Sequence, residues 1–153
     1  MDAKKFLKQL QKIDKMIVNK QSEIEQWKAI AEGTSAQCSG ERVQSSGSQD
    51  KMANAVCKYT SIEQEVERHR NELIDVKQDV IAVIESLENA TEYDVLHKMY
   101  IGKIVYREDG TTYNHYFEFQ EVADMYDRQY SWATTVHGRA LKNVQRILDA
   151  RKE

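Results

Sequence analysis

The chain contains no proline among its 153 residues. Proline interrupts helix interiors at a cost of about 3 kcal/mol, so its absence permits long unbroken helices. The sequence also lacks any apolar run approaching the roughly 20 residues that cross a bilayer, and its charged N-terminus has no signal-peptide core. We therefore expect a mainly α protein in the cytoplasm, with no membrane partner.

Residue types that carry catalysis are sparse as well. The two cysteines, Cys38 and Cys57, have no CxxC spacing and are expected to be free thiols in a reducing compartment. His97, His115 and His137 are dispersed, and no serine or cysteine has a recognisable nucleophile setting. No glycine-rich phosphate loop follows a strand, and no carboxylates have metal-site spacing. The sequence predicts a protein that is not an enzyme, with no cofactor and no metal.

The first 90 residues are dominated by two apolar series with alternating steps of three and four. Such heptad spacing is typical of helices that wind around a partner. The interval 33–51 is rich in Gly and Ser and has no periodicity, so a loop is expected there. Residues 1–90 are thus predicted to form a long antiparallel helical hairpin resembling a coiled coil. The first series is Phe6, Leu10, Ile13, Ile17, Ile24, Trp27 and Ala31; the second is Ile62, Val66, His69, Leu73, Val76, Val80, Val83 and Leu87.

Two features of this hairpin bear on partners. Lys20 and His69 interrupt the seam, either as register-specifying residues or as edge positions whose polar ends reach water. Ile74, Ile81 and Ile84 flank the second series and widen its apolar face beyond what one partner helix needs. This width predicts a homo-oligomer formed through the N-terminal helices.

Residues 91–153 are expected to form a second domain, beginning with a helix that Thr91 caps. Within it, residues 103–118 place β-branched and aromatic residues around Asp109-Gly110, a strong signal for an inserted β-hairpin with a type I′ turn. That turn would set Tyr106 opposite Tyr113.

The segment after this hairpin has the spacing of a helix-turn-helix. Val122 and Ala123 fall inside a first helix, and the turn four residues after Ala123 should hold a residue with left-handed backbone, usually glycine. Asp127 occupies that position. Ala133 and Val136 then point back from a second helix.

Positive charge is concentrated on this second helix. Residues 127–153 contain six Lys or Arg and three Asp or Glu, a net charge of +3, whereas the whole chain carries −3. Residues opposite its apolar stripe suit duplex DNA, with threonines for base edges near the helix start and basic side chains for phosphates. They are Thr134, Thr135, Arg139, Lys142, Gln145 and Arg146. A solvated helix face is the competing interpretation.

The stretch "YSWATTVHGRALKNVQ" resembles region 4 of bacterial sigma factors. More closely, through "GERVQSSGSQDKMANAV" and "HGRAL", nearly the whole chain resembles a family of small phage proteins of Gram-positive hosts. Members combine a coiled N-terminal part with a sigma-region-4-like domain and are regarded as transcription regulators. The resemblance implies DNA contact by Tyr130, Ser131, Thr134 and Thr135. It also favours Arg42 and Gln44 as candidate contacts for a partner such as RNA polymerase.

Three functions follow from these observations. The first is a phage-type transcription regulator, either a late-gene activator or sigma-like, whose dimer presents two recognition helices to half-sites roughly 34 Å apart. The second is a DNA-packaging component of the small-terminase type. The third is an interaction protein that docks on RNA polymerase or another protein and never touches DNA.

Overall fold

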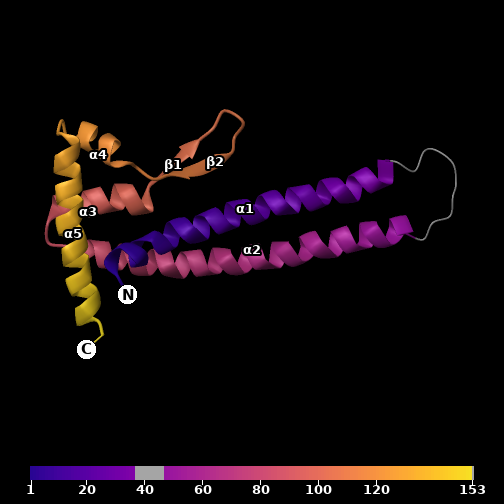
Figure 1. Cartoon of the computed structure of the whole chain (residues 1–153), viewed down its shortest axis with the longest axis horizontal. Helices are drawn as coiled ribbons and strands as arrows, with labels where there is room; N and C mark the ends of the chain where they lie inside the picture. Colours follow the sequence, from indigo (N-terminus) through magenta and orange to yellow (C-terminus); the bar gives the residue numbers. More distant parts are fainter. Residues whose placement is uncertain (37–46, 153) are drawn as a thin grey trace. The chain divides into compact units, whose positions relative to one another are not determined.

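The structure, a computed structural model, describes residues 1–36 and 47–152 and is mainly helical, as predicted (Figure 1). Its two longest helices are α1 (Ala3–Ala36, 34 residues) and α2 (Gly47–Glu85, 39 residues). The chain divides into two compact units. We call Lys12–Leu73 the hairpin unit, and Met1–Gln11 together with Ile74–Glu153 the C-terminal unit.

The hairpin unit pairs α1 with α2 in antiparallel order (Figure 1). Nζ of Lys20 lies 2.7 Å from Oε2 of Glu65, and Nζ of Lys28 lies 5.4 Å from the centre of the Tyr59 ring. Residue numbers thus rise along one helix as they fall along the other. These contacts at the edge of the seam add little to stability, because surface ion pairs contribute about 0–1 kcal/mol.

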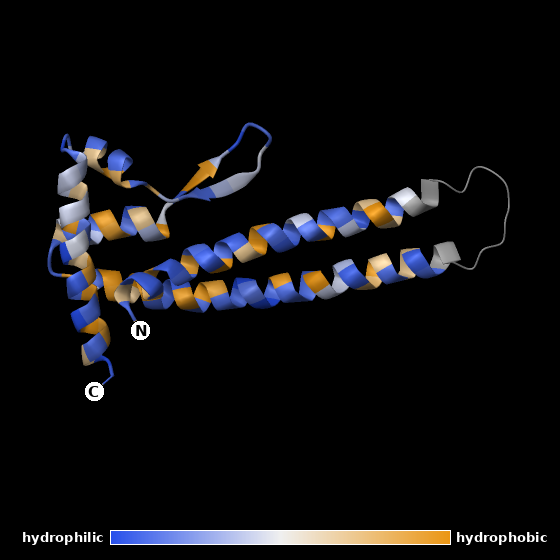
Figure 2. Ribbon diagram, viewed as in Figure 1, coloured by the Kyte–Doolittle hydropathy of each residue, from blue (hydrophilic) through white to orange (hydrophobic). Residues whose placement is uncertain are grey.

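Apolar seam residues supply the core of the hairpin unit, as the heptad spacing predicts. Hydrophobic residues recur along both helices among hydrophilic ones (Figure 2). His69 is buried and its Nδ1 lies 3.2 Å from Oε2 of Glu72, so it is not an edge residue, whereas Lys20 does reach solvent. The buried apolar residues of this unit include Ile13, Ile17, Ile24, Ala31, Ala55, Ile62 and Val66.

The predicted loop over residues 33–51 is too long. Helix α1 continues through Gly33 to Ala36, and α2 begins at Gly47. Glycine and serine are weak helix formers, but adding residues to an existing helix is easier than starting one, so long flanking helices extend into such a segment. Arg42 and Gln44, the expected partner contacts, lie outside the described residues.

The C-terminal unit contains six further elements, of which five are short and α5 is the one long helix. They are α3 (Ala90–Leu96), η2 (His97–Ile101), β1 (Lys103–Tyr106), β2 (Thr112–His115), α4 (Phe119–Met125) and α5 (Tyr130–Ala150). Both α3 and α4 pack against α5, and Val95, Val122 and Val136 from these three helices form a buried cluster. The orientation of α5 is therefore set by apolar contacts along one side.

The start of α3 differs from the prediction. Asn89, not Thr91, is the cap: its Oδ1 accepts hydrogen bonds from the backbone N–H groups of Thr91 and Glu92 at 2.9 and 3.1 Å. Asparagine is among the best residues at this position, because its short side chain reaches the first free N–H groups. The favourable cap lies two residues earlier than expected.

The β-hairpin is present, but its turn is not type I′. Its register places Tyr106 opposite Thr112 and Val105 opposite Tyr113, so the predicted pairing of Tyr106 with Tyr113 is wrong. Gly110 alone in the turn has positive φ (82°), whereas type I′ needs two such residues. The side chain of Asp109 accepts hydrogen bonds from Thr111, which favours the longer loop over the two-residue turn.

The apolar face proposed for self-association is only partly available. Ile84 is fully buried within the chain and Ile81 is half-buried, which is contrary to the expectation that they serve a second copy. Ile74 remains 55% exposed. Among the described residues, no helix combines the length and the apolar character that a membrane crossing requires.

Candidate nucleic-acid interface

A well-formed turn joins α4 to α5. The backbone N–H of Asp127 donates to the carbonyl of Asp124 at 3.2 Å, and that of Arg128 donates to the carbonyl of Ala123 at 2.9 Å. These two bonds make a Schellman motif, in which the residue after the cap takes a left-handed backbone. Asp127 does so, with φ 50°, as its spacing from Ala123 predicts.

The inner side of α5 is the predicted apolar stripe. Ala133, Val136, Ala140 and Val144 are all buried, and Ile147 is half-buried. Because the turn and this stripe together fix the rotation of α5 about its axis, the opposite side is held outward.

A polar cluster joins α3 to the end of α4, next to the first turn of α5. The hydroxyl of Tyr126 and the ammonium of Lys98 both donate to the carboxylate of Asp94, and the Tyr126 ring lies 4.9 Å from that of Trp132. Partial burial is the largest single influence on the pKa of Asp94 and raises it, but the two hydrogen bonds outweigh it and lower the pKa below the usual range. Asp94 therefore stays ionised at neutral pH and holds α3 against the start of α5.

The structure brings together five of the seven predicted DNA contacts. At 100° per residue these five fall within an arc of about 80° on the outer side of α5. Tyr130 and Thr134 lie outside this arc, and Thr134 is half-buried. We call the five the outer face: Ser131, Thr135, Arg139, Lys142 and Arg146, all of them exposed.

The basic residues of the outer face are not neutralised by nearby acids. Within residues 1–36 and 47–152 no ion pair involves Arg139, Lys142 or Arg146, although Arg146 approaches the amide oxygen of Asn143 at 3.4 Å. The two basic residues beyond them are occupied: Arg151 pairs with Asp79 and Lys152 with Asp149. Three positive charges are therefore available on a stretch of helix about 10 Å long.

The two threonines already use their hydroxyl protons. Oγ1 of Thr134 and Oγ1 of Thr135 donate to the backbone carbonyl of Ser131 at 2.9 and 2.8 Å. In this rotamer each hydroxyl oxygen can accept a hydrogen bond but has no proton to donate outward. Thr135 accordingly suits the amino groups of adenine or cytosine and, through its methyl group, thymine.

Gln145 is not part of the outer face, contrary to the prediction. Its Oε1 accepts a hydrogen bond from the backbone N–H of Ala3 at 2.8 Å, and its Nε2 lies 3.0 Å from Asp149. The residue ties α5 to the start of α1. Helical periodicity places Gln145 between the two sides of α5, and the N-terminal segment packed there was not foreseeable from spacing.

Gly138 lies beside the outer face: at 100° per residue it falls about 20° beyond Ser131, outside the arc of the five residues. A Cβ at this position would meet no heavy atom of the described residues within 4 Å beyond the neighbouring backbone of α5 itself, and the backbone does not need positive φ. Glycine in a helix interior is about 1 kcal/mol less favourable than alanine, and no contact within the described residues accounts for it.

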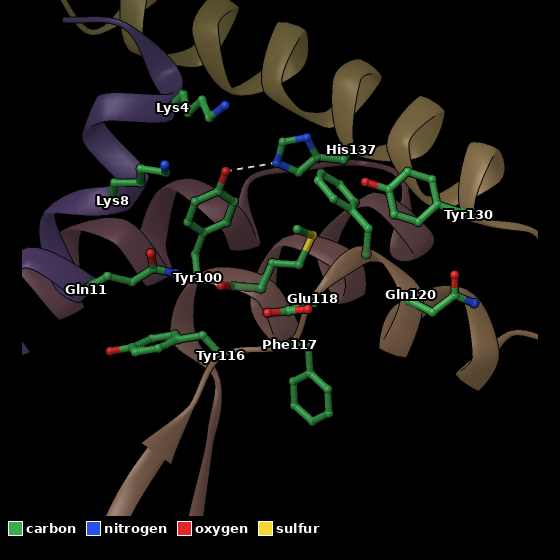
Figure 3. Close-up of a pocket in the computed structure, with 12 residues that line it drawn as sticks. Lys4, Lys8, Gln11, Tyr100, Tyr116, Phe117, Glu118, Gln120, Tyr130 and His137 are labelled. Carbon is green, nitrogen blue, oxygen red and sulfur yellow. Dashed lines mark hydrogen bonds between the residues drawn. The ribbon is translucent and has the colours of Figure 1, made fainter.

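A cavity beside this surface was missed by the sequence reasoning. It has a volume of about 420 Å³ and is lined by residues from α1, η2, α4 and α5 (Figure 3). Tyr130, a predicted DNA contact, lines this cavity instead. His137 also lines it and is buried against Tyr100, which agrees with the packing role that its position beside the apolar stripe indicates.

Comparison with known proteins gave no match to any family model, to any curated protein or to any solved structure.

Proposed function

We propose that this protein is a phage-type transcription regulator that binds duplex DNA through the outer face of α5. In this proposal α4 and α5 form a helix-turn-helix resembling that of sigma factor region 4, and α5 is the recognition helix. Arg139, Lys142 and Arg146 contact phosphates, while Ser131 and Thr135 approach base edges. The protein acts in the cytoplasm of a bacterial host as a homo-oligomer, with RNA polymerase as a further partner.

The observation that carries the proposal is a set of three exposed basic side chains, for which the described residues supply no ion-pair partner, on a helix whose opposite side is buried. Such a helix presents a fixed row of positive charge to solvent, and phosphate contacts supply most of the affinity of non-specific DNA binding. The Schellman turn at Asp127 and the bare backbone at Gly138 add to it. Because glycine has no side chain, the backbone of a helix can approach a DNA groove closely at that position. Reading of base edges requires such a close approach.

Selection from a pool of random DNA duplexes tests this proposal. The protein should enrich a common motif, and Thr135→Val should alter the preferred base at one position while leaving overall retention nearly unchanged. The variant replaces the hydroxyl by a methyl group and keeps the shape of the side chain. Recovery of no motif, together with no duplex binding at low salt, would refute the proposal.

One observation favours the alternative of protein docking without DNA. The β1–β2 hairpin exposes Ile104 and Tyr106 on one face, with Tyr106 78% exposed, and carries Glu108 and Asp109 at its turn. Acidic residues there would repel phosphate, whereas exposed apolar residues suit a protein surface. Loss of binding to RNA polymerase in a Tyr106→Ser variant, with unchanged DNA affinity, would support this alternative.

A further inference from the structure

The cavity in the C-terminal unit has the size of a small-molecule site. Its volume of about 420 Å³ lies within the range of roughly 300–1,000 Å³ that ligand pockets occupy. Four separate elements contribute to its wall, among them the first turns of α1 and the π-turn η2 (Figure 3). The site therefore exists only in the folded chain.

Aromatic rings in fixed orientations form the inner wall. The Phe119 ring meets His137 edge-on at 5.0 Å and Tyr130 edge-on at 5.7 Å. Tyr100 is stacked on His137, with ring centres 5.8 Å apart and planes 17° apart. Because these rings contact one another, they lose little conformational entropy when a flat ligand binds. The wall is therefore preorganised for an aromatic group.

The rim is positively charged. Lys4 and Lys8, one turn apart on α1, extend toward the Tyr100–His137 pair (Figure 3). No ion pair in the part of the chain that the structure describes involves either lysine. The one acidic residue in the lining, Glu118, uses its carboxylate to accept the backbone N–H of Glu121 at the start of α4. Among the lining residues, two lysines against one glutamate leave a charge of +1, while Asp2 lies close enough for its negative charge to raise the pKa of Tyr100.

The polar groups deeper in the cavity are neutral. Burial, together with the smaller effect of the charges of Lys4 and Lys8, lowers the pKa of His137 to about 4. Burial likewise raises the pKa of Tyr100 to about 12. At neutral pH this pair offers hydrogen-bonding atoms without charge, and the two lysines alone supply the positive potential.

The π-turn shapes this wall. The N–H of Gly102 donates to the carbonyl of His97 at 3.0 Å, five residues back, and this wider turn carries Met99 and Tyr100, both of which line the cavity. Such turns are uncommon and are frequent at functional sites.

From these observations we propose that the cavity binds a small anion that carries an aromatic ring. The ring lies against Phe119 and Tyr100, and the anionic group, a carboxylate or a phosphate, faces Lys4 and Lys8. Binding here does not depend on the protein contacting DNA.

Isothermal titration calorimetry with two aromatic anions and one neutral analogue tests this inference. 2-Naphthoate represents carboxylates, 2-naphthyl phosphate represents phosphates, and 2-naphthol has the same ring without the charge. At least one anion should bind, and 2-naphthol should bind about tenfold more weakly or not at all. Comparison of the two anions shows which anionic group the site prefers.

The double variant Lys4→Gln, Lys8→Gln should weaken binding of the anion about tenfold or more. The matched control is Lys5→Gln, Lys15→Gln, which removes two exposed lysines of α1 that do not line the cavity. Phe119→Leu should weaken both anions while the thermal melting of the protein shows that the fold is kept. Absence of heat for both anions at millimolar concentration, equal affinity for 2-naphthol, or equal losses in the two double variants would each overturn the inference. No DNA enters these measurements, so their failure is distinct from failure of the proposed function.

Discussion

The hydroxyl oxygen of Tyr100 lies 2.9 Å from Nε2 of His137, and both residues are buried. This pair joins the π-turn η2 to the middle of α5, 37 residues later in the chain. It lines the cavity together with Lys4 and Lys8 of α1, whose charges contribute to the lowered pKa of His137.

Protonation of His137 should destabilise the fold at acidic pH. Its pKa is about 4 in the folded chain and about 6.5 when unfolded, so between these values the unfolded chain binds more protons. The contribution to stability is complete above pH 6.5 and is lost as the pH falls toward 4. We expect a decrease of up to about 3 kcal/mol in the free energy of unfolding, measured by urea denaturation across this range, because each unit of pKa difference corresponds to about 1.4 kcal/mol.

The variant His137→Gln tests whether His137 is responsible. Glutamine can still bond to Tyr100 but does not titrate, so the variant should lose part of this pH dependence. His97→Gln, at a half-buried histidine on η2, is the control and should retain it. The expectation would be contradicted if the free energy of unfolding changed with pH in the same way in the wild type and in His137→Gln.

Substitutions at Asp127, whose backbone is left-handed, should change the stability of the protein according to the size and branching of the side chain at Cβ. Asp127→Gly should leave the protein as stable or more stable, because glycine takes positive φ without steric strain. Asp127→Val should lower the free energy of unfolding by about 1–2 kcal/mol, since a β-branched residue strongly resists this conformation. Chemical denaturation of the three proteins measures both changes, and equal midpoints would be inconsistent with the Schellman turn.

Gly102 is irreplaceable for a different reason. Its φ is 78°, and a Cβ there would lie 2.4 Å from the backbone oxygen of His115. Gly102→Ala should therefore destabilise the protein by about 2 kcal/mol or more and weaken the contact between η2 and β2. Gly110→Ala also places alanine at positive φ but in open space, so it serves as the control and should have the smaller effect in the same thermal melts.

Gly138→Ala separates stability from DNA binding. The added methyl group meets nothing inside the protein and should stabilise α5 by up to about 1 kcal/mol. If the backbone of α5 approaches a duplex here, the same methyl group should reduce DNA affinity severalfold. A filter-binding series that gave equal affinities would remove close approach as the reason for glycine at this position.

Periodic features of the fold were predictable from the sequence. The seam of the hairpin unit and the stripe Ala133–Val136–Ala140–Val144 follow from helical spacing alone, because burial of one side selects it. Asp127 was located by its distance from Ala123, since the Schellman geometry fixes the number of residues in the turn.

Features that depend on contacts distant in sequence were not predictable. The cavity brings together the first turns of α1 and the middle of α5, and only Lys4 and Lys8 at helical spacing and the aromatic run at residues 116–119 hinted at it. One local feature was missed as well: the carboxylate of Asp109 accepts hydrogen bonds from Thr111, which the Asp-Gly signal does not specify and which accompanies the different hairpin register. The π-turn leaves no signal in the sequence beyond Gly102 itself.

The salt dependence of duplex binding tests the central claim most directly. The triple variant Arg139→Gln, Lys142→Gln, Arg146→Gln removes the three charges of the outer face, and Lys58→Gln, Arg68→Gln, Lys77→Gln removes three exposed charges from α2. With affinity measured by fluorescence anisotropy between 50 and 200 mM salt, the slope of log affinity against log salt should become shallower by about 2–3 in the first variant, because each phosphate contact contributes about 0.9. The second variant should keep the wild-type slope. Equal slopes in the two variants, or a wild-type affinity that does not change with salt, would contradict DNA binding by this face.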